Sequence, residues 1–294
     1  MKVEKIVTHK EPRHWDDFIG VSLLKMSYPN AVVEMVHPQQ VPQEYYADER
    51  ICLVDVGGRY EPGKLNFDHH QDLNLNCSLI LVLKHIYELS VTSGVLRFID
   101  ISDRYGVKRA SEELGVRLDP VEDRMRKEIL LIDITTYGSV VGQVLWDNLL
   151  IDDYSIWLRK VYTELESKGL LDEPRRKLQE EEMRFLDKVS KAMFMDYGDV
   201  RVCMSSESFA PYHYRLFNEY GVDLLIERNS MERGHTSVIK NTASQKASRI
   251  DVSKVFEVYP QVFLHKGGFI AVLGVPFEEV DKELVLRLVV GEAV

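Results

Sequence analysis

Histidine and acidic side chains recur in this sequence at points where an expected strand or helix ends. Imidazole nitrogens and carboxylate oxygens without thiolates suit Mn²⁺, Fe²⁺, Co²⁺ or Zn²⁺. Two such cations about 3.5–4 Å apart, bridged by one carboxylate, activate water for attack on a phosphoryl group. Without cations, the same side chains in one crevice would be a costly group of unpaired charges. The candidate residues are His9, His14, Asp16, Asp55, Asp68, His69, His70 and Asp133.

The elements expected in the first half of the chain could gather these residues. Strands are predicted at Lys5–Thr8, Ala31–Val36 and Ile51–Val56, and helices at Trp15–Met26, Leu79–Leu89 and Pro120–Asp133. The run Ile51–Val56 is continuously apolar, which is typical of a strand buried on both faces of a parallel sheet. Residues Val95–Ser102 fit a strand or a helix. We predict an α/β fold with a mostly parallel sheet, which places ligands at the carboxyl ends of its strands.

The second half of the chain changes character. The charged segment KLQEEEMRFLDKVSKAMF predicts a long helix that connects two lobes. Further strands are expected at Val200–Ser205, Val222–Glu227, Thr236–Lys240, Val262–Leu264 and Gly268–Leu273. We therefore predict a catalytic domain at 1–150, a helical connector at 151–195, and a smaller mixed α/β domain at 196–294 that binds the substrate.

The composition narrows the function classes. The 294 residues include 37 basic and 47 acidic side chains, a net charge of −10, which disfavours strong binding to duplex DNA. The three cysteines form no C-x-x-C motif, as expected for reduced thiols in a cytoplasmic protein. No secretory signal is evident at the N-terminus, and no apolar run reaches the roughly 18 residues of a membrane span.

Each candidate has a plainer explanation when it is taken alone. His9 could be a hydrogen-bonded polar residue, and Asp55 before two glycines could form a turn. Asp133 late in a helix is unfavourable to the helix dipole and so calls for a partner. The adjacent His69 and His70 are harder to explain in this way. Because successive strand residues face opposite sides, one ring would point inward and the other along the crevice.

Taken in order, these motifs resemble those of the DHH phosphoesterase superfamily. The likeness is greatest to the melanocyte-proliferating-gene family of metal-dependent hydrolases and exonucleases. The motifs are His9…His14-x-Asp16, DVGGRYEPGKLNFDHH at 55–70, Ile132-Asp133, and HKGGFI at 265–270. The sequence departs from the family at Lys10-Glu11, Cys77-Ser78 and Ala271, and around Asp133, where only Ile132-Asp133 of a longer motif is kept. These departures bear on substrate preference more than on metal binding.

The resemblance implies two divalent metal ions. His9 and His14 would bind one ion, while Asp16, His69 and Asp133 would bind the other. Elsewhere in the superfamily an aspartate takes the place of His14, so a mononuclear site is left open. Manganese is the expected metal, with magnesium, cobalt, iron and zinc as alternatives.

The resemblance also implies roles around the ions. Asp55 would bridge them, and Asp68 would orient His69 and fix its tautomer. His70 would meet the phosphate as a hydrogen-bond donor or proton carrier.

The second lobe is expected to hold the substrate. Between Arg228 and Arg249 the chain has five Lys or Arg residues and one acid, which predicts a phosphate clamp or, more plainly, a solvated loop. Glycines would let the backbone approach a nucleotide closely. The candidate residues are Arg228, Arg233, His235, His265, Gly267 and Gly268.

These features predict a phosphoesterase that hydrolyses phosphodiester bonds in nucleotides or short single-stranded nucleic acid, as an exonuclease does. One alternative is a pyrophosphatase or exopolyphosphatase with the same metal centre. Another is a non-catalytic protein that binds nucleotides or a partner. A homodimer is left open. The G-x-x-x-x-G-K match at 58–64 is not read as a P-loop, since Leu65 replaces the required hydroxyl.

Overall fold

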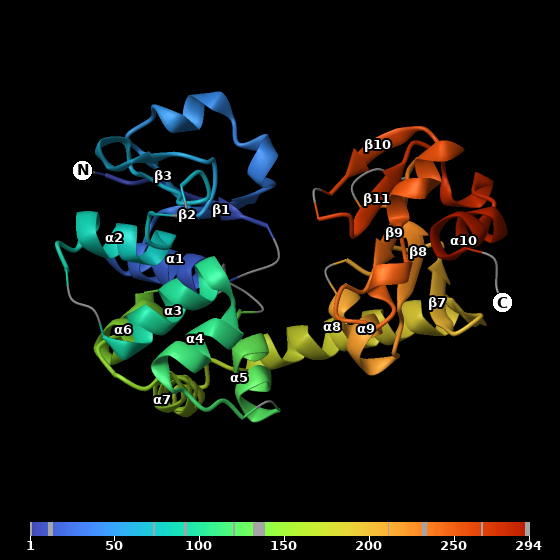
Figure 1. Cartoon of the computed structure of the whole chain (residues 1–294). Helices are drawn as coiled ribbons and strands as arrows, with labels where there is room; N and C mark the ends of the chain where they lie inside the picture. The colour runs from blue at the N-terminus through green and yellow to red at the C-terminus, as the bar shows by residue number, and fades with distance from the viewer. Residues whose placement is uncertain are drawn as a thin grey trace. The chain divides into compact units, whose positions relative to one another are not determined.

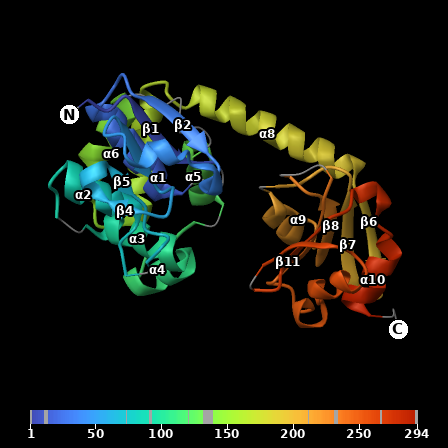
Figure 2. The same ribbon diagram turned by 90° about the horizontal axis from the view of Figure 1, so that it is seen from above.

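The computed structural model divides the chain into two compact units, residues 1–179 and 180–294 (Figure 1). The division falls within the predicted connector and inside helix α8 (Asp172–Lys191), which is one continuous helix (Figure 2). The structure describes residues 2–10, 14–72, 74–90, 93–119, 121–131, 139–210, 212–230, 234–265 and 267–291.

The first unit contains a five-stranded sheet in the order β2-β1-β3-β5-β4. Its strands are β1 (Lys5–His9), β2 (Val32–Val36), β3 (Ile51–Val54), β4 (Tyr60–Glu61) and β5 (Asn66–Phe67). Strands β2, β1, β3 and β5 are parallel, and the short β4 pairs antiparallel with β5. All four residues of β3 are buried, as its continuous apolar run predicts. The predicted mostly parallel sheet is confirmed.

Seven α-helices of the described part of the chain lie wholly within this unit. They are α1 (Trp15–Ser27), α2 (Ser78–Ile86), α3 (Gly94–Tyr105), α4 (Val107–Leu114), α5 (Glu122–Leu131), α6 (Ser139–Asn148) and α7 (Tyr154–Ser167). The ambiguous segment 95–102 is therefore helical. No helix in the described part of the chain is long and apolar enough to cross a membrane.

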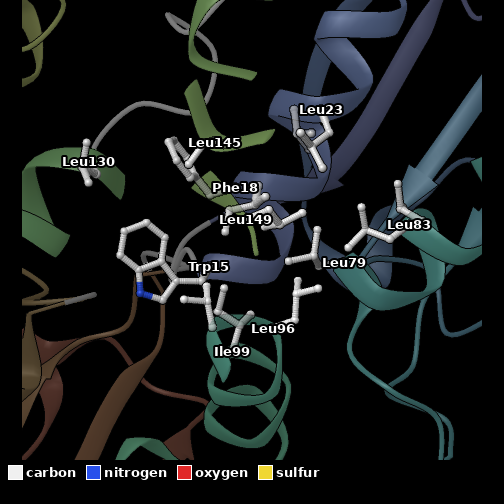
Figure 3. Close-up of a cluster of buried hydrophobic side chains, with 14 of the residues drawn as sticks. Trp15, Phe18, Leu23, Leu79, Leu83, Leu96, Ile99, Leu130, Leu145 and Leu149 are labelled. Atoms are coloured by element: carbon white, nitrogen blue, oxygen red, sulfur yellow. The ribbon is translucent and has the colours of Figure 1, made fainter. Parts of the chain in front are cut away.

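Helix α1 forms the centre of the hydrophobic core. Its first ten residues are all buried, because it packs against strands β1 and β3 and against helices α2, α3 and α6. Trp15 and Phe18 meet the leucines and isoleucine of the surrounding helices, including Leu79, Leu96 and Leu145 (Figure 3). Each fully buried side chain of this kind contributes about 1.5–3 kcal/mol. The core thus fixes the first turn of α1, which carries Asp16.

The second unit contains a six-stranded mixed sheet in the order β10-β11-β9-β8-β7-β6. Its strands are β6 (Met193–Tyr197), β7 (Val200–Ser205), β8 (Leu224–Arg228), β9 (Thr236–Lys240), β10 (Gln261–Leu264) and β11 (Ile270–Leu273). Figure 2 shows helices α10 (Lys282–Val290) and α9 (His213–Glu219) beside this sheet. Helix α10 packs in one hydrophobic cluster and α9 in another. The predicted mixed α/β character is confirmed, although Met193 and Phe194, which we expected to be helical, begin β6.

Candidate metal centre

Three neighbouring parallel strands deliver the predicted residues to one edge of the first sheet. His9 is the last residue of β1, Asp55 follows β3, and His69 lies two residues after β5. Because β1, β3 and β5 are adjacent and parallel, their carboxyl ends meet at the same edge. The start of α1 adds His14, its N-cap residue, and Asp16 in its first turn. Residues separated by about 60 positions of sequence therefore converge, as the parallel sheet implies.

Asp55 occupies the middle of this group. Its Oδ2 lies 3.1 Å from Nε2 of His9, and its Oδ1 lies 3.3 Å from Nε2 of His69 and 3.6 Å from Nδ1 of His70. The backbone of Asp55 has a φ of +58°, a left-handed conformation that non-glycine residues seldom adopt. Such strain persists where the surroundings impose it. The carboxylate presents one oxygen to each side, the arrangement that a bridging ligand needs.

The side chains form three overlapping sets with metal-ligand chemistry. Within each set one ligand atom per residue lies within 4.8 Å of the others. Asp55 belongs to two of the sets and His14 to two. The sets are His9, His14 and Asp55; Asp55, His69 and His70; and His14, Asp16 and Asp103.

Several buried atoms at this site make no hydrogen bond of good geometry, although some of them face an oppositely charged group. An unsatisfied buried polar atom costs about 1–3 kcal/mol, so a cluster of them needs an explanation. Their lone pairs and their N/O chemistry fit divalent cations, which would coordinate them directly. The atoms are Asp16 Oδ1, Asp17 Oδ2, His14 Nδ1, which lies 3.2 Å from Asp103 Oδ1, and His69 Nε2 and Asp103 Oδ2, which lie 3.0 Å apart.

The protonation equilibria of the site also reflect concentrated negative charge. Burial lowers the pKa of His9, but the hydrogen bond to Asp55 and the charge of Asp17 raise it more, to about 9. Burial likewise opposes the charge on His69, while Asp103 and Asp55 raise its pKa to about 10. Burial raises the pKa of Asp16 well above its usual range, and the nearby carboxylates add to this. Positive charge is therefore strongly favoured at this position.

Contacts behind the ligand atoms fix their orientation. Nδ1 of His9 donates to the carbonyl oxygen of Lys10 at 2.5 Å, which leaves Nε2 as the ligand atom facing Asp55. Asp17 is fully buried, and its Oδ1 accepts hydrogen bonds from the backbone N–H of His14 at 2.9 Å and of Phe18 at 2.7 Å. Asp17 thus holds the start of α1, and it was not among the predicted site residues.

Asp68 has a different contact from the one we expected. Its Oδ1 accepts from the backbone N–H of His70 at 2.9 Å and lies 2.8 Å from Nδ1 of the same ring. Its Oδ2 accepts from the backbone N–H of Gly58 at 2.6 Å. We predicted that Asp68 orients His69, but side chains two residues apart in extended chain face the same side. Asp68 therefore holds His70, whose side chain is 57 % exposed.

Asp103 is the main site residue that sequence reasoning missed. It lies on α3, with Oδ1 3.2 Å from Nδ1 of His14 and Oδ2 3.0 Å from Nε2 of His69. The signal was present: in a helix, Asp103 shares a face with the core residues Leu96 and Ile99, where an acid is unexpected. Asp133 lies outside the described residues.

Lys127 on α5 was also not predicted. Burial lowers the pKa of its ammonium group, while the carboxylates of Glu128, Asp103 and Asp17 act in the opposite direction. The net result is a lowered pKa for a lysine that lies within electrostatic range of the acidic site.

The predicted substrate-binding residues are divided between opposite ends of the second sheet. Arg228 pairs with Thr236 across β8 and β9, so Arg228 and His235 lie at one end. The hairpin of His265, Gly267 and Gly268 lies at the other end, where Lys240 N–H donates to the carbonyl oxygen of Phe269. The length of β9 separates the two groups by roughly 13 Å. Arg233 lies outside the described residues.

Most of the basic side chains in this region have acidic or carbonyl partners. Arg228 forms an ion pair with Glu278, Lys246 pairs with Asp223 at 2.9 Å, and Arg249 pairs with Asp199 at 2.6 Å. These side chains are therefore engaged within the unit. The structure therefore does not bring these three basic side chains together in one phosphate clamp.

The hairpin with His265 has a conformation of its own. Nδ1 of His265 accepts from the backbone N–H of Gly267 at 2.9 Å, and its ring lies 3.8 Å from that of Phe269. Gly268 has a φ of +63°, which favours glycine. The hairpin thus presents two adjacent rings beside a tight glycine turn.

Comparison with known proteins agrees with the motifs. The family model MYG1_exonuc, described as an uncharacterised protein family (UPF0160), matches residues 5–76, which include the motifs from His9 to His70. Among solved structures, the chain is similar to a pGpG-specific phosphodiesterase, PggH from Vibrio cholerae. That likeness has 14 % sequence identity and a TM-score of 0.50, and it covers 98 % of this chain and 99 % of the other. It shows a shared fold. No curated protein matches the sequence.

Proposed function

We propose that this MYG1-type, DHH-like protein is a metal-dependent phosphodiesterase with a dinuclear centre at the carboxyl edge of its first sheet. The observation that carries the proposal is the position of Asp55 between two sets of nitrogen and oxygen ligands. The buried ligand atoms that lack a well-formed hydrogen bond, Asp16 Oδ1 among them, support it further. The ligands would be His9, His14 and Asp55 on one side, and Asp55, Asp16, His69 and Asp103 on the other, with Asp133 still a candidate.

The reaction is hydrolysis of a phosphodiester. Two divalent cations at this site would supply Lewis acidity and an activated water. Water adds its oxygen to phosphorus, the P–O bond to the leaving nucleoside breaks, and a proton passes to the leaving oxygen. His70 is the exposed residue beside the ligands, and Asp68 holds its Nδ1. The carboxylates of Asp68 and Asp55 raise the pKa of His70, so its imidazolium form can donate to Asp68 through Nδ1 and to the phosphate through the other ring nitrogen.

We infer that the substrates are dinucleotides or short single strands. The fold is shared with a protein whose name specifies pGpG. The net charge of −10 disfavours long duplexes, whose binding depends on many phosphate contacts. The paired rings of His265 and Phe269 offer a surface on which a base can stack.

Metal analysis followed by a substrate panel tests the proposal. Purified protein is expected to retain or take up two Mn²⁺ per chain and to hydrolyse pGpG and short oligonucleotides. The variant Asp55→Ala should lose at least one ion and about 10³-fold in rate, since it removes the shared ligand. Unchanged metal content and hydrolysis in that variant would refute the centre. Hydrolysis of pyrophosphate without hydrolysis of any oligonucleotide would show that the substrate is pyrophosphate or polyphosphate instead of a nucleic acid.

A further inference from the structure

Ser78 contacts two of the candidate ligands at once. It is the first residue of α2 and is fully buried. Its hydroxyl donates to Oδ1 of Asp55 at 2.9 Å, and its backbone N–H donates to Oδ2 of Asp16 at 3.2 Å. Asp55 comes from the end of β3 and Asp16 from the first turn of α1. A single residue therefore joins two carboxylates that reach the site from different elements.

The start of α2 is itself anchored to α3. Oδ1 of Asp100 accepts from the backbone N–H of Cys77 at 2.7 Å, and its Oδ2 accepts from the side chain of Asn76 at 3.2 Å. Arg104, one turn later on α3, pairs with the same carboxylate. The helix that carries Asp103 thus also fixes the residues immediately before Ser78.

The hydrogen bond from Ser78 determines which acceptor positions of the Asp55 carboxylate remain available to other ligands. Each carboxylate oxygen has about two acceptor positions. The Ser78 hydroxyl takes one position on Oδ1 and leaves the other facing His69. The hydrogen bond also opposes rotation of the carboxylate, which keeps Oδ2 directed at His9. The N-terminus of α2 adds a favourable dipole for both carboxylates.

We propose that Ser78 is a positioning residue that holds Asp55 and Asp16 in the orientation required for binding two metal ions. The inference rests on the proposed function, since it assumes that the site binds metal. Ser78 would not ligate an ion itself. Its removal should weaken metal binding through Asp55, most strongly for the ion on the side of Oδ1.

The test measures Mn²⁺ affinity directly, from the electron paramagnetic resonance signal of free Mn²⁺ during titration of the full chain. In Ser78→Ala the ion on the His69 side is expected to bind 10- to 100-fold more weakly, as is usual when an outer hydrogen bond to a ligand is lost. Ser78→Thr keeps the hydroxyl and should restore affinity to within about threefold of wild type.

Ser22→Ala is the matched control. Ser22 is a buried helical serine on α1 whose hydroxyl donates to the carbonyl oxygen of Phe18 at 2.7 Å, a hydrogen bond that involves no candidate ligand. It should bind Mn²⁺ with wild-type affinity. Equal losses in Ser22→Ala and Ser78→Ala would overturn the inference, because the effect would then follow from any buried hydroxyl.

The remaining outcomes separate the two proposals. A wild-type protein that binds two ions, with unchanged affinities in Ser78→Ala, overturns the positioning role alone. A wild-type protein that binds no Mn²⁺ overturns the proposed function and this inference with it. If Ser78→Ala does not fold, Asp100→Asn serves instead, because it disturbs the anchor of Cys77 without touching Asp55. Asp100→Asn should weaken Mn²⁺ binding at least threefold, and wild-type affinity there would also overturn the role.

Discussion

Replacing Asp16 by asparagine should stabilise the metal-free protein and reduce the stabilisation that bound metal ions provide. Asp16 is fully buried, and its neighbours include the carboxylates of Asp55, Asp103 and Asp17. One oxygen of Asp16 lies within 4.8 Å of one of Asp103. At that distance and an effective dielectric constant of about 20, two negative charges repel by about 3.5 kcal/mol. A shorter separation would increase this repulsion, and proton uptake by Asp16 relieves part of it.

The sign of the pH dependence follows from the raised pKa of Asp16. An aspartate whose pKa is higher in the folded than in the unfolded state loses stability as pH rises from its unfolded pKa, about 3.9, to its folded pKa. In EDTA, Asp16→Asn should therefore match wild type near pH 3.5 and exceed it at pH 7. At about 2–4 °C per kcal/mol for a unit of this size, the gain in Tm is several degrees.

Added Mn²⁺ should reverse the order of stability. A ligand at 100 times its Kd raises the free energy of unfolding by about 2.7 kcal/mol. Wild type should gain more stability from Mn²⁺ than Asp16→Asn does. Calorimetry in EDTA and in Mn²⁺ measures both effects. Asp123→Asn is the contrast. Buried Asp123 has a cationic partner in Arg126 at 2.8 Å, so this substitution should lower the stability of the protein in either buffer. Asp16 would be a structural residue if Asp16→Asn had a lower Tm than wild type in EDTA at pH 7 and Mn²⁺ raised the Tm of both proteins equally.

Two further substitutions probe the surroundings of the ligands. Asp68→Asn should lower hydrolysis about 10- to 100-fold with two ions still bound, because Asp68 holds His70; loss of metal in this variant, measured by elemental analysis, would make Asp68 a ligand instead. Gly57→Ala should destabilise by about 1–3 kcal/mol and lower Mn²⁺ affinity, since Gly57 has a φ of +99° and an added Cβ would lie 2.9 Å from the Tyr46 ring. Gly115→Ala, at a φ of +66° with open space around it, should cost only the backbone strain, so equal urea midpoints for the two variants would contradict the role of the Tyr46 contact.

The sequence was most informative where a buried parallel strand ends. The apolar runs before His9 and Asp55 predict adjacent strands, and the parallel arrangement alone brings their ends together. Asp103 escaped prediction because residues 95–102 allow a strand or a helix, and only the helix places Asp103 on the face of Ile99. Local pattern leaves such short apolar segments undecided, and tertiary packing decides them.

The second unit shows a different limit. Arg228 and His265 both stand beside polar, glycine-containing segments of the sequence, which made them look alike as candidates. The sheet places them at opposite ends because β8 and β9 are antiparallel and β10 and β11 form a hairpin. Strand order and register depend on contacts distant in sequence, so composition alone could not separate the two groups.

The architecture also explains how a site so rich in acids can belong to a folded chain before metal binds. Asp16 and Asp17 lie in the first turn of α1, where the helix dipole favours negative charge by about 0.3–1 kcal/mol each. The same helix buries Trp15 and Phe18, whose burial contributes about 1.5–3 kcal/mol apiece. The core therefore offsets the repulsion among the carboxylates and keeps the ligands in place. It follows that metal affinity should be measurable on folded, metal-free protein, and that unfolding in EDTA at neutral pH would contradict this account of the site.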